Sequence, residues 1–330
     1  MVQGKKIVVV MPAYNAASTI ERTYDEVMAQ GVVDLVIVVD DGSRDETAAV
    51  ARSLPCVRLH VHPENRGYGA NQKTCYRLAI EAGADVVIML HPDYQYTPRL
   101  IPAMASMVAS GLYPCVMGSR ILGGQAVRGG MPLWRYVSNR LLTAVENVLT
   151  GAKLSEYHSG YRAFASDLLR RLPLEACSND FVFDNQVLTQ VLWTGATVAE
   201  VSCPTRYAPE SSSISFGRSI VYGFGCLDTA VRYRLARLGA VRSPVFPPAL
   251  KDAWPKDRRC RPAWVSIVTV ARRPARRAGA APGPAPARGR PRPPARSPGR
   301  RTAADPPGGR LRPAPGRPRR GSGGARGRRR

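Results

Sequence analysis

Short runs of apolar, mostly β-branched residues alternate with longer segments of mixed polarity over the first 120 residues. The apolar runs occupy residues 7–11, 35–39, 57–61, 85–90 and 114–118. The segments between them that have helical length and composition are 16–30, 44–54, 69–83 and 97–110. Continuous apolar runs are typical of strands buried on both faces. Their alternation with helices predicts an α/β protein with a mostly parallel central sheet and helices on both faces.

This alternation breaks after residue 120. A Gly-rich segment, 123–132, is followed by a predicted helix at 132–150 and a last predicted strand at 197–204. We interpret this half as part of the same domain, because it adds too few elements for a second fold. The sequence therefore predicts one catalytic domain over residues 1–215.

Residues 217–238 have apolar side chains at helical spacing. These are Ile220, Phe224, Leu227, Val231, Leu235 and Leu238. Arginines occupy many of the remaining positions, so the pattern indicates an amphipathic helix region, which we bound at 216–250. Two interpretations stay open: a surface helix packed on the core, or a helix that lies on a membrane with its arginines toward lipid phosphate.

The net charge of +24 belongs almost wholly to the C-terminal 80 residues. Residues 251–330 contain 24 basic and three acidic side chains, which leaves +3 for residues 1–250. From about residue 273 the sequence is nearly all Arg, Pro, Ala and Gly, a composition that predicts disorder. Such a tail binds polyanions or anionic lipid without specificity, or is a by-product of GC-rich coding DNA. It has no RNA-binding motif, so we expect no specific nucleic-acid partner.

The remaining composition favours a cytoplasmic protein without a membrane span. The seven cysteines are scattered and form no CxxC pair, which is typical of reduced thiols. The apolar run at 264–270 is too short to cross a bilayer.

Small and acidic residues gather where four of the apolar runs end. The segments are MPAYN (11–15), VVDDGSRDET (38–47), MLHPDYQ (89–95) and GSR (118–120). Because ligands of open α/β sheets bind at the carboxyl ends of the strands, these four clusters predict one site. Their carboxylates suit a divalent cation, and a cation in turn indicates an anionic ligand such as a nucleoside diphosphate.

The motifs PAYN, DDGS, HPDYQ, GSR, SGYRAF (159–164) and EVSCPTRYAPES (200–211) occur in this order. In this respect the chain resembles family-2 glycosyltransferases over about residues 5–235, with the polyprenyl-phosphate sugar synthases as the most similar branch. The resemblance implies a GT-A-like fold that binds a nucleotide sugar. It also implies inverting transfer of a hexose from a GDP- or UDP-linked donor to a polyprenyl phosphate at the cytoplasmic membrane face.

The same resemblance assigns binding residues. It places the nucleotide-sugar donor on Pro12, Tyr14, Asn15, Asp40, Asp41, Gly67, Asn71 and Arg206. Gly67 stands in the segment 64–73, where helix N-terminal amides were expected to face the nucleotide. For the lipid-phosphate acceptor, the resemblance implies Arg120, Arg135 and Ser138.

Asp93 and Gln95 stand two residues apart, so on an extended segment both side chains point the same way. Both offer oxygen ligands to Mg²⁺ or Mn²⁺. The family usually has an Asp where this chain has His91. Imidazole is a poor ligand for Mg²⁺ and a better one for Mn²⁺, so His91 either ligates the cation, hydrogen-bonds the donor or only packs.

The acceptor class stays open at the level of sequence. A phosphate acceptor is already ionised near neutral pH, whereas a hydroxyl acceptor needs a general base. Asp180 and Asp184 lie where hydroxyl-transferring relatives place that base. The alternatives are therefore a transferase to a glycan or lipid hydroxyl, or a nucleotide-sugar binding protein that lost catalysis when His91 replaced an acid.

Overall fold

The computed structural model describes residues 1–205 and 216–255. Its strands are β1 (Ile7–Ala13), β2 (Leu35–Asp40), β3 (Val57–Val61), β4 (Val86–Met89), β5 (Cys115–Ser119), β6 (Arg162–Ala165) and β7 (Val198–Ser202). Its helices are α1 (Ile20–Met28), α2 (Thr47–Ser53), α3 (Tyr68–Glu81), α4 (Ile101–Ala109), α5 (Leu133–Thr150), α6 (Ser166–Leu169), α7 (Phe183–Trp193) and α8 (Phe216–Arg237). Short 3₁₀ turns are η1 (Pro98–Leu100), η2 (Leu174–Ala176) and η3 (Pro248–Leu250).

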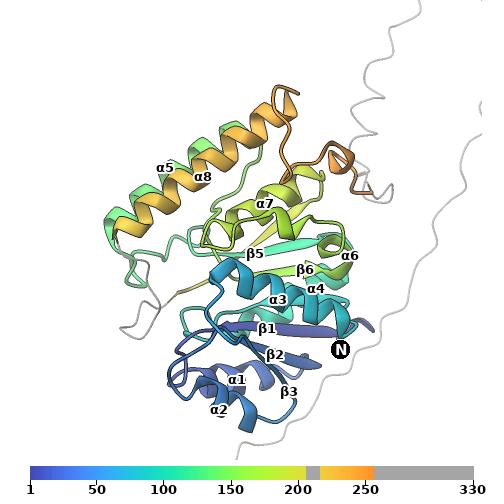
Figure 1. Ribbon diagram of the computed structural model, residues 1–330, viewed down its shortest axis with the longest axis vertical. Coiled ribbons are helices and arrows are strands. Elements are labelled where there is room, and N and C mark those ends of the chain that lie inside the picture. Colours follow the sequence, from blue (N-terminus) through green and yellow to red (C-terminus); the bar gives the residue numbers. More distant parts are fainter. Residues whose placement is uncertain (206–215, 256–330) are drawn as a thin grey trace, which may run out of the picture. The chain divides into compact units, whose positions relative to one another are not determined.

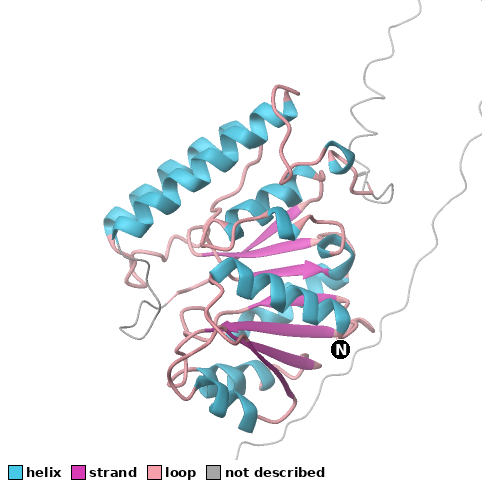
Figure 2. Ribbon diagram, viewed as in Figure 1, coloured by secondary structure: helices cyan, strands magenta, loops and turns pink. Residues whose placement is uncertain are grey.

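The strands form one seven-stranded sheet in the order β3-β2-β1-β4-β6-β5-β7 (Figures 1 and 2). Neighbouring strands are parallel except where β6 pairs antiparallel with both β4 and β5. The predicted mostly parallel α/β sheet is therefore confirmed. Because β6 is short and carries the buried Arg162, its apolar run was too weak to indicate a strand in the SGYRAF segment.

Helices cover both faces of the sheet, as the strand pattern predicts. Val8 and Val10 of β1 face α3 and α7, where they join a core that includes Tyr76 and Leu188. Ile7, Val9 and Met11 face the other side, in the core that contains residues of α1, α2 and α4. This strict alternation fixes the register, since a slip of one residue would exchange the two faces. The carboxyl ends of the parallel strands consequently meet along one edge.

Helix α8 packs on the core through a small buried face. Cys226, Ala230 and Tyr233 are buried, and Tyr233 joins Trp193 and Phe246 in an aromatic cluster. The apolar positions that the sequence singled out lie on the opposite side: Phe224 is 69% exposed and Leu238 is 68% exposed. Helix α8 thus packs on the core, but through residues other than those of its apolar stripe, which faces outward.

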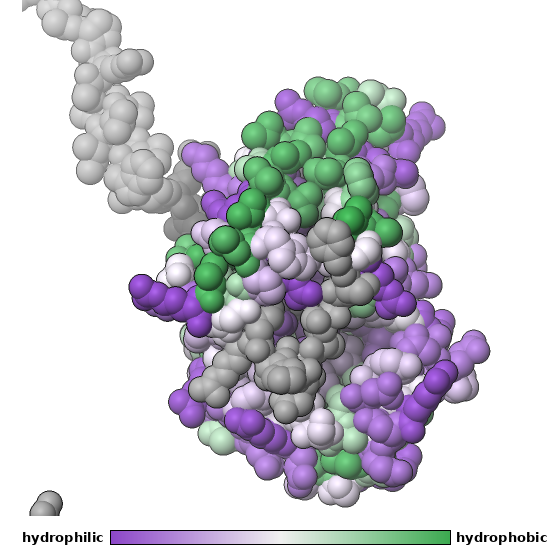
Figure 3. Space-filling view, turned by 90° about the vertical axis from the view of Figure 1, so that its left-hand side faces the viewer, coloured by the Kyte–Doolittle hydropathy of each residue, from purple (hydrophilic) through white to green (hydrophobic). Residues whose placement is uncertain are grey.

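Helix α5 is inverted in the same way and lies beside α8 (Figure 1). Its buried residues are polar: Asn139, Thr143 and Glu146. Its exposed side chains include Leu133, Trp134, Val137, Leu141, Val145 and Val148. Apolar side chains accordingly gather on the upper part of the face shown in Figure 3. An exposed apolar surface of this kind, built from two adjacent helices, marks an interaction surface.

Within residues 1–205 and 216–255, no helix is both long enough and apolar enough to cross a membrane.

Candidate active site

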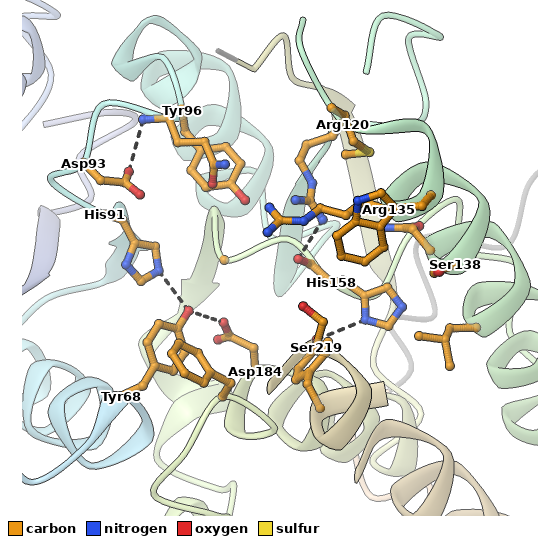
Figure 4. Close-up of a pocket in the computed structure, with 18 residues that line it drawn as sticks. Tyr68, His91, Asp93, Tyr96, Arg120, Arg135, Ser138, His158, Asp184 and Ser219 are labelled. Carbon is orange, nitrogen blue, oxygen red and sulfur yellow. Dashed lines mark hydrogen bonds between the residues drawn. The ribbon is translucent and has the colours of Figure 1, made fainter. Parts of the chain in front are cut away.

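Two adjoining cavities lie at the carboxyl edge of the sheet. The first, of about 360 Å³, opens at the end of β1 and is called here the β1 cavity. The second, of about 220 Å³, is walled by α5 and is called the α5 cavity (Figure 4). Tyr68, His91, Asp93 and Phe181 line both cavities. A reaction between two ligands, one in each cavity, would therefore take place beside these four side chains.

Most residues that the resemblance assigns to the donor line the β1 cavity. They are Pro12, Tyr14, Asn15, Asp41, Gly67 and Asn71. Asp40 does not line it, because this buried carboxylate accepts hydrogen bonds from the backbone N–H and the hydroxyl of Ser43. Asp40 therefore stabilises the turn after β2. Arg206 lies outside the described residues.

Asp41 ties the end of β2 to the loop before α3. Its carboxylate accepts from the backbone amides of Arg66 and Gly67, each at 3.0 Å, and pairs with His62 Nδ1 at 2.7 Å. Asn71 has a similar bracing part, since its Nδ2 donates to the Val39 carbonyl at 3.1 Å. Both residues thus shape the wall of the β1 cavity through contacts within the protein.

The expectation that the glycine-rich turn offers free amides to a nucleotide is corrected for two of its residues. Gly67 N donates to Asp41, and Gly69 N donates to the Asn179 carbonyl at 2.7 Å. Gly67 has φ +97, and a Cβ at Gly69 would lie 2.8 Å from the Phe183 Cβ. These glycines are needed because the chain before α7 passes directly against the start of α3.

Three side chains at the junction of the cavities form a hydrogen-bonded chain (Figure 4). The Tyr68 hydroxyl donates to Asp184 Oδ2 at 2.5 Å and lies 3.1 Å from His91 Nε2. The Tyr68 and His91 rings are stacked, with centroids 5.4 Å apart. Burial raises the pKa of Tyr68 well above its ordinary value, and the charge of Asp184 raises it further. Tyr68 therefore keeps its proton at every physiological pH.

Asp93 and Gln95 both line the α5 cavity, and Asp93 also faces the β1 cavity. Asp93 Oδ1 accepts from the Gln95 backbone amide at 3.1 Å. The described part of the chain holds no group of three or more His, Cys, Asp and Glu side chains arranged for a metal ion. A cation would instead fit with Asp93 as the carboxylate, His91 and Gln95 nearby, and phosphate oxygens of a ligand completing the shell, which is the usual arrangement for Mg²⁺ with nucleotides.

The three residues assigned to the acceptor, Arg120, Arg135 and Ser138, all line the α5 cavity. Arg120 is held from behind by Glu156, which is fully buried: Arg120 Nε donates to Glu156 Oε1 at 2.7 Å. The guanidinium of Arg135 lies 5.2 Å from the ring centre of Trp134. The cavity thus combines cationic groups with aromatic and apolar walls.

Asp180 and Asp184 are separated by the structure. Asp180 precedes α7 and lines the β1 cavity, whereas Asp184 lies within α7 and lines the α5 cavity. Asp184 is 7% exposed, and its carboxylate accepts a hydrogen bond from the Tyr68 hydroxyl. The sequence placed the two aspartates together, but they line different cavities.

Tyr68, Glu156 and His158 are site residues that the sequence analysis did not identify. His158 lines the α5 cavity, with Nδ1 3.0 Å from the Tyr222 hydroxyl and Nε2 3.3 Å from the buried Glu146. A signal existed in each case, because Glu156 and His158 directly precede the SGYRAF motif and Tyr68 stands between Gly67 and Gly69. Polar residues that adjoin a motif are therefore candidate site residues as well.

The fold and the double cavity at the carboxyl edge define a glycosyltransferase of the GT-A type. The family model "Glycosyl transferase family 2" matches residues 8–172. The chain belongs to glycosyl transferase family 2, and it is an enzyme of that class.

Several curated relatives carry names of lipid-phosphate sugar transferases. The chain is 26% identical over 250 residues to the UDP-N-acetylglucosamine–dolichyl-phosphate N-acetylglucosaminyltransferase of Methanococcus voltae, covering 71% of this chain and 96% of that protein. It is 26% identical over 203 residues to the polyprenol monophosphomannose synthase of Mycolicibacterium smegmatis, covering 60% and 76%.

A solved structure with the same fold is glucosyl-3-phosphoglycerate synthase from Mycobacterium tuberculosis in complex with UDP. The TM-score is 0.54 at 22% identity, and the match covers 73% of this chain and 82% of that one. The likeness shows the shared GT-A architecture.

Proposed function

We propose that this family-2 glycosyltransferase moves a hexose, with inversion, from a GDP- or UDP-linked donor to a polyprenyl phosphate. The observation that carries the proposal is the composition of the α5 cavity. Arg120 and Arg135 supply positive charge, while Trp134 and Leu142 line the same cavity from a helix whose outer face is apolar. A phosphate with a long hydrocarbon tail needs this combination.

The donor side is supported by the β1 cavity. It lies at the carboxyl ends of β1 and β2, where nucleotides bind in open α/β sheets. One named relative is a UDP-N-acetylglucosamine–dolichyl-phosphate transferase and another is a polyprenol monophosphomannose synthase, and both names support a lipid-phosphate acceptor. A carboxylate accepts equally well from uracil and guanine, so the proposal covers both UDP- and GDP-linked donors.

A phosphate acceptor is consistent with the hydrogen bond between Asp184 and Tyr68. A phosphate monoester has a second pKa of about 6, so its attacking oxygen is already charged at neutral pH and no protein base is required. Asp184 already accepts a hydrogen bond from the Tyr68 hydroxyl, and Asp180 faces the donor side. The chain's own residues then bind and orient: the arginines hold the acceptor phosphate while the β1 cavity holds the nucleotide.

Asp93 is the residue that would hold Mg²⁺ or Mn²⁺, because its carboxylate faces both cavities. When bound, the cation stabilises the negative charge of the departing nucleoside diphosphate.

The exposed apolar face of α5 and α8 supports a place at the cytoplasmic face of a membrane. Val148 is 78% exposed, Val221 70% and Phe224 69%. Trp134, Leu142 and Tyr222 belong to the same two helices and line the α5 cavity, so the apolar face continues toward the acceptor. A peripheral protein resting on this face would receive a lipid phosphate directly from the bilayer.

The full chain, labelled UDP- and GDP-hexoses, Mn²⁺ and vesicles with polyprenyl phosphate provide the test. We expect label to pass into the lipid extract with polyprenyl phosphate and not with the matched polyprenol. Arg135→Gln should lower this transfer about tenfold or more, whereas Arg232→Gln, in an exposed pair with Asp228, should not. Equal transfer to polyprenol or to a glycan hydroxyl would favour the hydroxyl-acceptor alternative, and nucleotide binding without any transfer would favour a binding protein.

Vesicle flotation tests the membrane face separately. The parent should float with neutral vesicles, which offer no charge to the basic tail, and Phe224→Asp should sediment without them. Leu112→Asp is the control, because Leu112 is 50% exposed but belongs to neither helix. If Phe224→Asp floats like the parent and instead changes the oligomeric state, the apolar face binds a second copy of the chain.

A further inference from the structure

We propose that Tyr68 is a positioning residue that, together with Asp184, fixes the tautomer of His91 and makes its Nδ1 a ligand for a divalent cation shared with Asp93. The consequence is a site that discriminates in favour of Mn²⁺ over Mg²⁺. The inference rests on the proposed function only in that the cation accompanies a nucleoside diphosphate.

The direction of the hydrogen bonds follows from counting protons. An ionised carboxylate only accepts, and the Tyr68 hydroxyl has one proton to give. That proton goes to Asp184 Oδ2, 2.5 Å away. His91 Nε2 lies 3.1 Å from the same hydroxyl oxygen, so Nε2 must carry a proton and donate it to Tyr68. In the neutral ring, Nδ1 is then the nitrogen with the lone pair.

Arg162 supports the turn of α7 that carries Asp184. Arg162 is fully buried, and its Nη1 donates to the backbone carbonyl of Asp184. Burial lowers the pKa of Arg162, but the charge of Asp184 and the other nearby groups together raise it above its ordinary value, so the guanidinium stays charged. The charged guanidinium thus holds the backbone of α7 at the residue that accepts from Tyr68.

The position of the imidazole is equally constrained. Its ring stacks on Tyr68 with an interplanar angle of 9°. The Phe181 ring also packs against Tyr68, with ring centroids 4.8 Å apart. A Cβ at Gly160 would lie 2.7 Å from His91 Nε2. Only glycine at this position lets the ring approach Tyr68. His91 is thus part of a built arrangement and does more than fill space.

A histidine ligand whose other ring nitrogen donates to a polar neighbour is the common pattern of protein metal sites, because the second bond fixes the tautomer and makes the ligand more basic. Here the neighbour is Tyr68, itself polarised by Asp184. Imidazole suits Mn²⁺ better than Mg²⁺, which prefers oxygen. The replacement of the family's usual acid by His91 is therefore accommodated by Tyr68 and does not abolish cation binding.

The test is electron spin-echo spectroscopy of Mn²⁺ bound to the full-length protein with UDP, repeated with GDP. We expect modulation from a directly bound ¹⁴N nucleus, which changes to the ¹⁵N pattern in protein labelled at histidine and disappears in His91→Gln. Absence of nitrogen modulation in the parent would overturn the proposal without the need for any variant.

The part played by Tyr68 is measured by cation affinity in the presence of UDP. Tyr68→Phe should weaken Mn²⁺ binding about tenfold or more, the range typical for loss of such a neighbour, with little change for Mg²⁺. In a His91→Gln background the same change should have no further effect on Mn²⁺. Tyr76→Phe is the matched control, because Tyr76 belongs to α3 and its hydroxyl contacts only Gln72 among the described residues.

An equal loss of Mn²⁺ and Mg²⁺ affinity in Tyr68→Phe, or a full effect of Tyr68→Phe without His91, would contradict a positioning role. These measurements do not depend on turnover. If Mn²⁺ binds through nitrogen but no sugar is transferred, the proposed function fails and this inference stands. If transfer occurs without nitrogen ligation, the reverse holds.

Discussion

Arg120 and Glu156 form a hydrogen-bonded ion pair at the wall of the α5 cavity. Both Nε and the backbone amide of Arg120 donate to the Glu156 carboxylate, at 2.7 and 2.9 Å. Glu156 is fully buried and also accepts from Asn139 Nδ2 at 2.9 Å. The pair joins the end of β5 to the segment between α5 and β6, and Asn139 ties it to α5, so it links the acceptor side to the core.

Glu156→Gln should destabilise the protein by about 3 kcal/mol at pH 7, the lower end for a broken buried ion pair, because Arg120 stays partly hydrated. Burial raises the pKa of Glu156, but the charge of Arg120 and its hydrogen bonds lower it by more, to below its ordinary value. A depressed pKa contributes stability above the unfolded-state value of 4.5, and this contribution is lost as the pH falls below it. Urea unfolding at pH 7 and pH 3.5 measures both: the gap between parent and variant should shrink in acid, and a constant gap would contradict the pairing.

Asp93→Ala should reduce kcat/KM by about 10²–10³-fold, the cost of losing one group that stabilises developing charge. Among the described residues, Asp93 is the carboxylate that lines both cavities. Asp228→Ala, at an exposed pair on α8, is the control. If Asp93→Ala turns over at the parent rate, Asp93 has no part in the reaction.

Asp180→Asn and Asp184→Asn should each cost less than about tenfold in kcat, because a phosphate acceptor needs no base and asparagine can still accept from Tyr68. Removal of a general base would cost about 10²–10⁴-fold. The measurement is single-turnover transfer in protein that still binds nucleotide. A thousandfold loss with either variant would indicate a hydroxyl acceptor and identify the aspartate responsible.

Gly69→Ala should lower stability by about 1–3 kcal/mol, the usual cost of overpacking. The added Cβ would lie 2.8 Å from the Phe183 Cβ and push α7 away from α3. Gly223→Ala in α8 is the matched control: its Cβ would make ordinary contact with Leu142 at 3.7 Å, and helix propensity should raise stability by up to about 1 kcal/mol. Thermal unfolding of the two variants should therefore shift in opposite directions, and two shifts of the same sign would refute this account of Gly69.

The helix–strand alternation of the first 120 residues was predictable because each element there is encoded locally. The runs that form β1, β2 and β4 are continuous and apolar, and buried parallel strands need no partner to be recognised. Polar residues at their carboxyl ends necessarily meet at one edge. For this reason Asp41, Asn15 and Asp93 were assigned to one site from sequence alone, and they line adjoining cavities.

The orientation of α5 and α8 was decided by the tertiary structure. Apolar spacing shows that a helix is amphipathic, but it does not say which face meets the core. In α5 the buried Glu146 has partners in Asn185 and His158, which lie 39 and 12 residues further along the chain. Because distant polar groups satisfy its inner face, the apolar face remains outside.

The chemistry at the junction of the cavities also depends on distance along the chain. Tyr68 and Asp184 are 116 residues apart, and their hydrogen bond exists only because α3 and α7 pack on the same face of the sheet. The sequence by itself determined every strand except β6, together with the family and the residue types at the strand ends, since these follow from local pattern. Which carboxylate meets which hydroxyl was fixed only by folding, because one hydrogen bond depends on sub-ångström placement that no local pattern encodes.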